Sequence, residues 1–199
     1  MSVKWAKSYL GATDGDTAES WYGDYYAWGE IETKPNYSWS TYKYANGSGD
    51  TLTKYCNNAE YGNEGYTDEL TQLVSEDDVA TVSYGGNWRM PTKAECEELL
   101  AGTTTRWVEN YNNIEGLNGR VFTSKVNGNT LFMPAAGYYD GSRIDNIGFD
   151  GSFWSSSLEL DAPDCAYFLV YYADSVGENI IAVSAGGRDE GFSIRPVCK

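Results

Sequence analysis

The sequence has no histidine, and this absence removes several kinds of catalysis at once. Without an imidazole, serine and cysteine nucleophiles lose their usual general base, and the common zinc sites and three-histidine iron sites cannot be built. The four cysteines, Cys56, Cys96, Cys165 and Cys198, lie far apart and form no Cys-x-x-Cys pair. Four cysteines allow three disulfide pairings, and their spacing does not choose among them. We therefore expect a protein that is not an enzyme and that holds no metal or other cofactor.

Positive charge is scarce as well. The chain has 14 Lys and Arg against 29 Asp and Glu, a formal net charge of -15. Such a field opposes contact with nucleic-acid phosphates and with anionic membrane surfaces. There is no apolar run long enough to span a bilayer and no charged-then-apolar leader. We expect no nucleic-acid partner and no membrane insertion by this chain, so that any display at a cell or virion surface uses a signal or an assembly route outside it.

The C-terminal stretch lacks four residue types that the rest of the chain uses. Residues 155–198 contain no Trp, Met, Lys or Gln, whereas the preceding 154 residues contain 18 of them, so about five would be expected in this stretch. A β-rich tail has little use for Met, Lys and Gln, which is one explanation. Apolar runs at 166–172, 179–183 and 192–194, separated by glycines, predict three short strands that form one sheet.

Glycine and large aromatic residues are abundant. The chain has 22 Gly, 17 Tyr and 7 Trp among 199 residues, which predicts a loop-rich fold with an aromatic core. Five of the eight residues from Trp21 to Trp28 are aromatic, and we expect this cluster to be buried. The alternative is a carbohydrate-stacking platform at Trp21, Tyr25 or Tyr139. No repeat or linker divides the chain, so residues 1–199 form one domain.

Local signals place a helix and a hairpin. Thr92 with Glu95 forms a capping box, and the helix that follows is expected to bury Cys96 and to end at Gly102. Acidic residues at 76–78 are expected to cap a second helical turn rather than to hold Ca²⁺. Asn127-Gly128 predicts a two-residue type I′ hairpin turn. Residues 31–66 alternate polar and aromatic side chains without a helical period, which predicts a long irregular segment.

Six segments, in chain order, carry a resemblance to a known family. They are Tyr-Tyr-Ala-Trp-Gly-Glu at 25–30, Lys-Tyr at 54–55, Trp-Arg-Met-Pro-Thr-Lys-Ala-Glu at 88–95, Phe-Met-Pro-Ala-Ala-Gly-Tyr at 132–138, Trp-Ser-Ser-Ser at 154–157 and Ser-Ile-Arg-Pro-Val at 193–197. In these segments the chain resembles the major paralogous domain first named from Fibrobacter and abundant in gut Bacteroidetes. That family is similar to the formylglycine-generating-enzyme branch of the C-type lectin-like fold. The resemblance implies an α+β domain with two helices, short antiparallel sheets, extensive irregular loops and adjacent termini.

The resemblance also implies a role. Many such domains are targets of diversity-generating retroelements, which rewrite adenines in a C-terminal variable region, chiefly in Asn-type codons. Codons rewritten in this way cannot encode Trp, Met, Lys, Gln or Glu, and the tail lacks the first four. Its three glutamates, Glu159, Glu178 and Glu190, would then belong to the scaffold, as would Trp154 and Arg195. We therefore predict a scaffold over about 1–153 and a variable, ligand-binding region over about 154–198.

Other members of the broader fold are oxidases or calcium-dependent sugar-binding proteins. The sequence lacks the catalytic cysteine pair of the former and the calcium-binding tripeptides of the latter. The oxidases use two cysteines a few residues apart, whereas Cys165 and Cys198 are 33 residues apart. The calcium-binding tripeptides Glu-Pro-Asn, Gln-Pro-Asp and Trp-Asn-Asp do not occur. Paired carboxylates for glycoside hydrolysis are conceivable among 29 acids, but nothing marks two of them.

The leading hypothesis is a non-catalytic ligand-binding or adhesion domain that displays a hypervariable patch. Its partner would be a protein or glycan ligand on another cell or virion, and its own place would be a bacterial cell surface or a phage virion. The alternatives are a carbohydrate-binding module and an unvaried structural domain of a surface lipoprotein. The predicted patch consists of Arg143, Ile144, Asn146, Phe149, Asp161, Asp164, Phe168, Val170, Tyr171, Asp174, Ser175, Val176, Asn179, Ile181, Ser184, Arg188 and Asp189.

Overall fold

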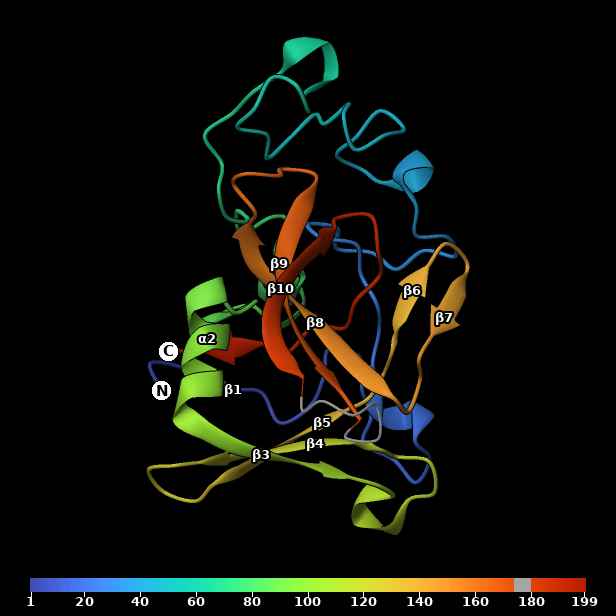
Figure 1. Cartoon of the computed structure of the whole chain (residues 1–199), viewed down its shortest axis with the longest axis vertical. Coiled ribbons are helices and arrows are strands. Elements are labelled where there is room, and N and C mark those ends of the chain that lie inside the picture. The colour runs from blue at the N-terminus through green and yellow to red at the C-terminus, as the bar shows by residue number, and fades with distance from the viewer. Residues whose placement is uncertain (174–179) are drawn as a thin grey trace.

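The computed structural model covers residues 1–199 and describes residues 1–173 and 180–199. Within this part of the chain there are two α-helices, α1 (Val79–Tyr84) and α2 (Lys93–Gly102), and several small sheets (Figure 1). Short 3-10 helices, η1 to η4, lie at Glu19–Trp21, Trp39–Thr41, Asn63–Gly65 and Tyr111–Asn113. The fold is α+β, the class that the family resemblance implies.

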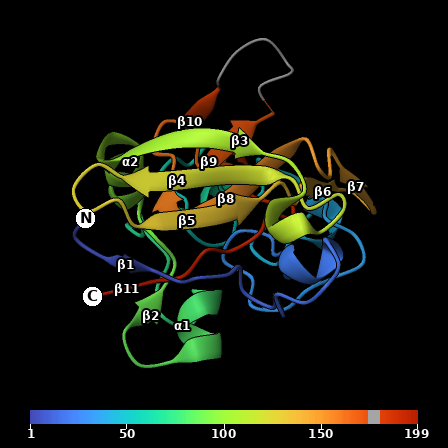
Figure 2. The ribbon, with the colours of Figure 1, turned by 90° about the horizontal axis from the view of Figure 1, so that it is seen from below.

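The strands of residues 1–173 and 180–199 form four antiparallel sheets. They are β1 (Lys4–Trp5), β2 (Trp88–Arg89), β3 (Thr103–Val108), β4 (Gly119–Ser124), β5 (Thr130–Pro134), β6 (Tyr138–Asp140), β7 (Arg143–Asp145), β8 (Asp150–Leu158), β9 (Cys165–Tyr172), β10 (Ile181–Gly187) and β11 (Val197–Cys198). The sheet orders are β1-β11-β2, β10-β9-β8, β3-β4-β5 and β6-β7. In Figure 2 the β3-β4-β5 sheet lies in front of the β10-β9-β8 sheet.

The two ends of the chain pair with each other. Lys4 lies opposite Cys198 and Trp5 lies opposite Val197 in the β1–β11 ladder. Figure 1 shows the two ends side by side next to α2. This agrees with the adjacent termini that the family resemblance implies.

The prediction of the tail sheet was partly wrong. Two of its strands are β9 and β10, but the third is β8 and not residues 192–194. Phe192 and Ser193 make only isolated bridges, to Tyr26 and Phe153. The physical reason is that β8 is nine residues long and almost wholly buried, so it offers β9 a long ladder that a three-residue segment cannot match.

The core is built from large rings. Trp28 and Trp154 are fully buried, and Trp154 stacks on Phe192 with ring centroids 4.2 Å apart. The predicted burial of the cluster from Trp21 to Trp28 is confirmed, since all five of its aromatic side chains are buried. Both indole N–H groups in the centre are satisfied, because Trp28 donates to the Ser155 carbonyl and Trp154 donates to the Tyr26 carbonyl.

The predicted N-termini of both helices are confirmed. The Thr92 hydroxyl accepts the Glu95 N–H at 3.2 Å, and the Glu95 carboxylate accepts the Thr92 N–H at 2.8 Å, which completes the capping box of α2. Cys96 is fully buried, and α2 ends at Gly102 as expected. Asp78 is the N-cap of α1 and accepts the Thr81 N–H at 2.9 Å.

The prediction of a two-residue turn at Asn127-Gly128 was wrong. The connection between β4 and β5 runs over residues 125–129, and the Ser124 N–H donates to the Asn129 carbonyl at 2.9 Å. A type I′ turn requires positive φ at both central residues, but here Gly128 has φ +72° and Asn127 does not share the left-handed region. A longer loop results, with the exposed Val126 at its tip.

Candidate ligand-binding face

The two faces of β9 have different surroundings. Leu169 and Tyr171 point into the core, where the hydroxyl oxygens of Tyr171 and Tyr9 lie 2.9 Å apart and Tyr171 donates to the Pro134 carbonyl. On the opposite side Phe168 and Tyr172 are only half-buried. Leu169 and Tyr171 therefore face the core, whereas the even-numbered side of this strand carries the half-buried Phe168 and Tyr172 together with the buried Ala166 and Val170.

Strand β10 extends the side of the sheet that carries Phe168 and Tyr172. Ser184 lies opposite Phe168 and Ala182 lies opposite Val170, and both β10 residues are half-exposed. Side chains that face each other across an antiparallel pair stand on the same side of the sheet. We use "outer face" for the side of β9 and β10 that carries Phe168, Tyr172, Ala182 and Ser184.

The β6–β7 hairpin borders the loop that follows β10. Tyr139 and Gly191 exchange two backbone hydrogen bonds, of 2.8 and 3.0 Å. Beside this contact Tyr138 packs edge-on against Phe192, which in turn packs against Phe168 at 4.7 Å between centroids. Aromatic contacts therefore link the hairpin that carries Arg143 and Ile144 to the Phe168 end of the outer face.

Ten of the predicted patch residues are at least partly accessible. Those that are exposed are Arg143, Asn146, Phe149 and Asp161, and those that are half-buried are Ile144, Asp164, Phe168, Ile181, Ser184 and Asp189. Phe149 is the most accessible large apolar side chain among them, with 63% of its surface exposed. Arg143 forms an ion pair with Asp145 at 2.8 Å on the surface.

Two groups of accessible residues lie at opposite ends of β9. At the Cys165 end, Asp164 and Asp189 lie around Trp39 and the start of the 187–191 loop, since a Cβ on Gly49 would lie 3.2 Å from Asp164 and 3.1 Å from Trp39. At the other end the Phe149 carbonyl accepts the Ala173 N–H at 2.8 Å. An eight-residue strand is about 23 Å long, so the outer face is the surface between the two groups.

Three predicted patch residues were placed wrongly, because they belong to the core. Tyr171 and Arg188 are fully buried, and Val170 is 6% exposed. Tyr171 is on the inward side of β9, and Val170 stands in the middle of the three-stranded sheet, between Ser152 and Ala182. Side chains alternate between the two sides of a strand, but when both sides carry aromatic residues the sequence does not show which side faces water. The sequence therefore could not distinguish Tyr171 from Tyr172.

Arg188 is a structural cation. Its guanidinium donates to the carbonyls of Lys54, Tyr55 and Pro163 at 2.7 to 3.0 Å and to the Tyr42 hydroxyl at 3.0 Å. Its carbon centre also lies 4.9 Å from the Trp28 ring. Polar acceptors and ring faces together replace the water that burial removes from the charge. Four further predicted residues, Asp174, Ser175, Val176 and Asn179, lie outside the described residues.

Several accessible positions were not predicted from the sequence. Tyr172 and Ala182 belong to the outer face but were not among the predicted residues. Their signal was the period-two alternation with Phe168 and Ser184, which becomes usable only once the pairing of the two strands is known. Ile147 and Ile180 are also exposed apolar side chains, each 40% accessible.

Three carboxyl groups near this region have raised pKa values. Burial raises the pKa of Asp150 to about 6, and the hydrogen bond from Asn146 opposes this increase. Burial raises the pKa of Asp189 to about 6 and the pKa of Glu190 to about 7. The negative charge of Asp189 adds to the increase in the pKa of Glu190. The surface around Asp189 and Glu190 therefore gains negative charge as the pH rises from about 5 to about 7.

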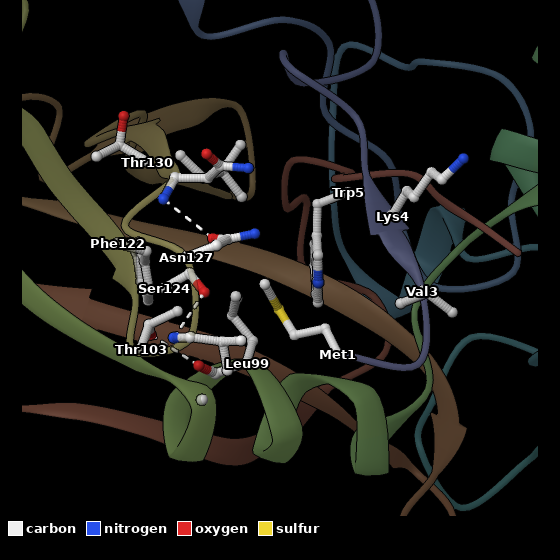
Figure 3. A pocket seen from close by; sticks show the side chains of 14 residues that line it. Met1, Val3, Lys4, Trp5, Leu99, Thr103, Phe122, Ser124, Asn127 and Thr130 are labelled. Carbon is white, nitrogen blue, oxygen red and sulfur yellow. Dashed lines mark hydrogen bonds between the residues drawn. The ribbon is translucent and has the colours of Figure 1, made fainter.

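A separate apolar cavity of about 400 Å³ lies between the N-terminal strand, the end of α2 and the β4–β5 hairpin. Figure 3 shows Trp5 and Met1 on one side of it and Phe122, Asn127 and Thr130 on the other. None of its lining residues belongs to the outer face or to the predicted patch.

The alternative of a carbohydrate-stacking platform is corrected at two of its three positions. Trp21 and Tyr25 are buried, and their rings pack edge-on against Tyr111, Phe132 and Tyr139. Tyr139 is half-buried between Tyr25 and Tyr37, with centroids 5.1 and 5.0 Å away. No free ring face of Trp21 or Tyr25 is therefore available for a sugar.

Over residues 1–173 and 180–199 there is no group of three or more Cys, Asp or Glu side chains arranged to hold a metal ion. All four cysteines are free thiols, and burial raises the pKa of Cys165 to about 11. Neither helix in this part of the chain has the length and apolar character needed to cross a membrane.

Comparison of the chain with family models, with curated proteins and with solved structures found no match in any of the three.

Proposed function

We propose that this chain is a non-catalytic ligand-binding domain whose outer face and adjoining loops contact a protein or glycan on another cell or virion. The observation that carries the proposal is the outer face itself. Phe168, Tyr172, Ala182 and Ser184 are partly accessible, while the backbone beneath them is held in a three-stranded antiparallel sheet. Ala182 and Ser184 can change their side chains at little cost to the fold, whereas Phe168 also packs against Trp154 and Phe192.

The composition of the surface also supports binding. Tyrosine and phenylalanine provide large contact area with few rotatable bonds, and Ser184 adds an adaptable hydrogen-bonding group. The sheet holds its backbone before the ligand arrives, so little conformational entropy is lost on binding. The exposed Phe149 extends the apolar area at one end of β9, and the acidic Asp189 marks the other end.

We further propose that a diversity-generating retroelement exchanges these side chains and that the fold is C-type lectin-like. The absence of Trp, Met, Lys and Gln from residues 155–198 supports the first proposal. Paired termini, two helices in the described residues and a long irregular segment support the second. The buried Trp154 and Arg195 are suited to the role of scaffold residues that the resemblance implies.

Binding can be tested with a matched pair of substitutions. Ser184→Arg places a bulky charge on the outer face, whereas Thr104→Arg places the same side chain on an exposed position of β3 in another sheet. We expect fluorescently labelled protein to bind a panel of intact bacterial cells or a glycan array. Ser184→Arg should abolish that binding, while Thr104→Arg should keep it and both variants should melt at the wild-type temperature. Equal effects of the two variants, or no binding by the wild-type protein, would contradict the proposal.

Diversification can be tested separately from binding. The genome that encodes the chain should contain a near-identical copy of the DNA for residues 154–198, and the two copies should differ at adenines of the template. Differences scattered over all four bases, or the lack of any such copy, would refute the retroelement and leave an unvaried binding or structural domain.

A further inference from the structure

The outer edge of β10 has no partner within the described residues. β10 is the last strand in the order β10-β9-β8, and no segment of residues 1–173 or 180–199 pairs with its other side. Figure 2 shows β10 at the margin of its sheet, with β9 and β8 further in. The opposite margin differs, since the β8 residues Trp154, Ser156 and Leu158 donate their N–H groups to Ser193, Pro91 and Thr71.

The register identifies the backbone groups on this edge. The Tyr172 N–H donates to the Ile180 carbonyl, so residues 180, 182, 184 and 186 direct their backbone groups toward β9. The intervening residues Ile181, Val183 and Ala185 therefore direct their N–H and C=O groups outward. An open row of such groups is a template for another strand.

This edge also lacks the features that prevent strand pairing. Residues 180–187 contain no charged side chain and no proline. By contrast β3, the edge of the β3-β4-β5 sheet, carries the exposed Arg106. The β10 edge is about 20 Å long, and all seven of its residues pair with β9 on the other side.

We propose that a second copy of this chain pairs with β10 in antiparallel orientation, which joins the two three-stranded sheets into one sheet of six strands. With Val183 opposite Val183 of the second copy, Ile181 and Ala185 of one copy lie opposite Ala185 and Ile181 of the other. All three pairs then use the outward backbone groups, which gives about six hydrogen bonds between the copies. Each of the two edges supplies the same residues, so one two-fold axis satisfies both.

Side-chain sizes match in this register. Ile180, which is 40% exposed, lies opposite Gly186 of the second copy, and Ala182 lies opposite Ser184. A Cβ on Gly186 would lie 3.0 Å from the Phe168 ring and 3.7 Å from the Glu190 carboxylate, so Ile180 of the second copy would meet these two side chains above the glycine. The exposed Ile180 of each copy therefore covers a small residue beside an aromatic ring, and no charged side chain of 180–187 is buried.

The two-fold axis is perpendicular to the sheet, so the outer faces of both copies lie on the same side. Pairing uses the strand edge and leaves Tyr172 of each copy accessible on β9, while Ile180 of the second copy packs beside the Phe168 ring. The proposal stands independently of the ligand, but together with the proposed function it predicts a doubled binding surface that gains from avidity.

The net charge predicts how the dimer responds to salt. Each chain carries -15, and the repulsion between two copies weakens as salt shortens the screening length from about 30 Å at 0.01 M to about 10 Å at 0.1 M. Dimerisation should therefore strengthen with added salt. A dimer held by ion pairs would respond in the opposite direction.

Sedimentation equilibrium of the whole chain tests the proposal. Between about 5 and 500 µM protein at 0.15 M salt, the mass should rise from the 22.0 kDa monomer toward twice that value. Ala185→Pro removes an outward N–H without breaking the ladder to β9 and should weaken association at least about tenfold. Ala185→Ser keeps the N–H and should associate like the wild-type protein. Amide exchange at Val183 and Ala185 should slow as the wild-type concentration increases.

The control for folding is the melting temperature, which should be equal for the proline and serine variants. If Ala185→Pro unfolds the protein, Val183→Pro removes the neighbouring outward N–H and takes its place. A chain that stays monomeric over the whole range, or a dimer that both proline variants leave intact, would overturn the proposal. Amide protection at Val183 without any rise in mass would also overturn it.

Discussion

The Arg188 guanidinium donates a hydrogen bond of 3.0 Å to the Tyr55 carbonyl, across 133 residues of sequence. This contact ties the long irregular segment to the C-terminal tail. We predict that Arg188→Met destabilises the protein by at least about 3 kcal/mol, because the buried carbonyls of Lys54, Tyr55 and Pro163 lose their donor. Chemical denaturation measures the free energy of unfolding.

Arg143→Met is the matched control for that change. Arg143 was predicted for the same patch, but it is exposed and its ion pair with Asp145 is accessible to water. Its loss should change the free energy of unfolding by less than about 0.5 kcal/mol. Equal losses of unfolding free energy in the two arginine variants would show that the hydrogen bonds of Arg188 do not stabilise the fold.

Asp77 is a buried charged residue that links segments within the first half of the chain, as Arg188 links the irregular segment to the tail. Its carboxylate accepts hydrogen bonds of 2.5 and 2.6 Å from the hydroxyls of Tyr44 and Tyr55, and the Lys54 ammonium lies 2.6 Å away. Burial alone would raise its pKa, but these three donors outweigh burial and lower it. Asp77→Ala should cost about 3 to 5 kcal/mol of unfolding free energy, because it leaves two buried hydroxyls and the partly exposed Lys54 ammonium without an acceptor.

Acid titration gives a second measurement on the same residue. A lowered pKa means that the contribution of Asp77 to stability is present above its ordinary pKa of 3.8 and is lost as the pH falls through the lower folded-state value. The difference in unfolding free energy between wild type and Asp77→Ala should therefore shrink below about pH 4. A difference that stays constant into acid would contradict the assigned charge on Asp77.

Asp150 should behave in the opposite way. Burial raises its pKa from 3.8 to about 6, so the folded state holds a proton that the unfolded state has released, and stability falls as the pH rises from about 4 to about 6. Asp150→Asn removes this dependence. Relative to wild type, the variant should gain about 1 to 3 kcal/mol between pH 4 and pH 7.

Urea unfolding at several pH values checks that prediction. The gain should level off above about pH 6, where Asp150 is ionised in both states. Asp161→Asn, at an exposed position, provides the control and should follow the wild-type curve. Parallel curves for wild type and Asp150→Asn would refute the raised pKa.

Neighbouring tyrosines test which side of β9 faces the core. Tyr171 is fully buried and makes two hydroxyl contacts, so Tyr171→Ala should cost about 3 to 5 kcal/mol. Tyr172 is half-buried, and Tyr172→Ala should cost about 1 kcal/mol. Thermal unfolding measures both, and similar costs would remove the distinction between the inner and outer faces.

Local interactions made part of the structure predictable. The Thr92–Glu95 capping box and the Asp78 N-cap depend on residues three apart, so their sequence signals are complete in themselves. The Asn127-Gly128 signal failed because the loop closes through Ser124 and Asn129, outside the dipeptide. The candidate site was harder to predict, because the accessibility of Phe168 or Tyr171 depends on elements far away in the chain.

Composition alone predicted the aromatic core and excluded histidine chemistry, because both depend on which residues are present, whereas the α+β class followed from the family resemblance. Only the tertiary structure decided that Arg188 is a buried tie while Arg143 is a surface residue, and that β8 rather than residues 192–194 completes the tail sheet. The physical reason is that burial is a property of the packed whole. A strand alternates between two sides, and only its neighbours in space determine which side meets water.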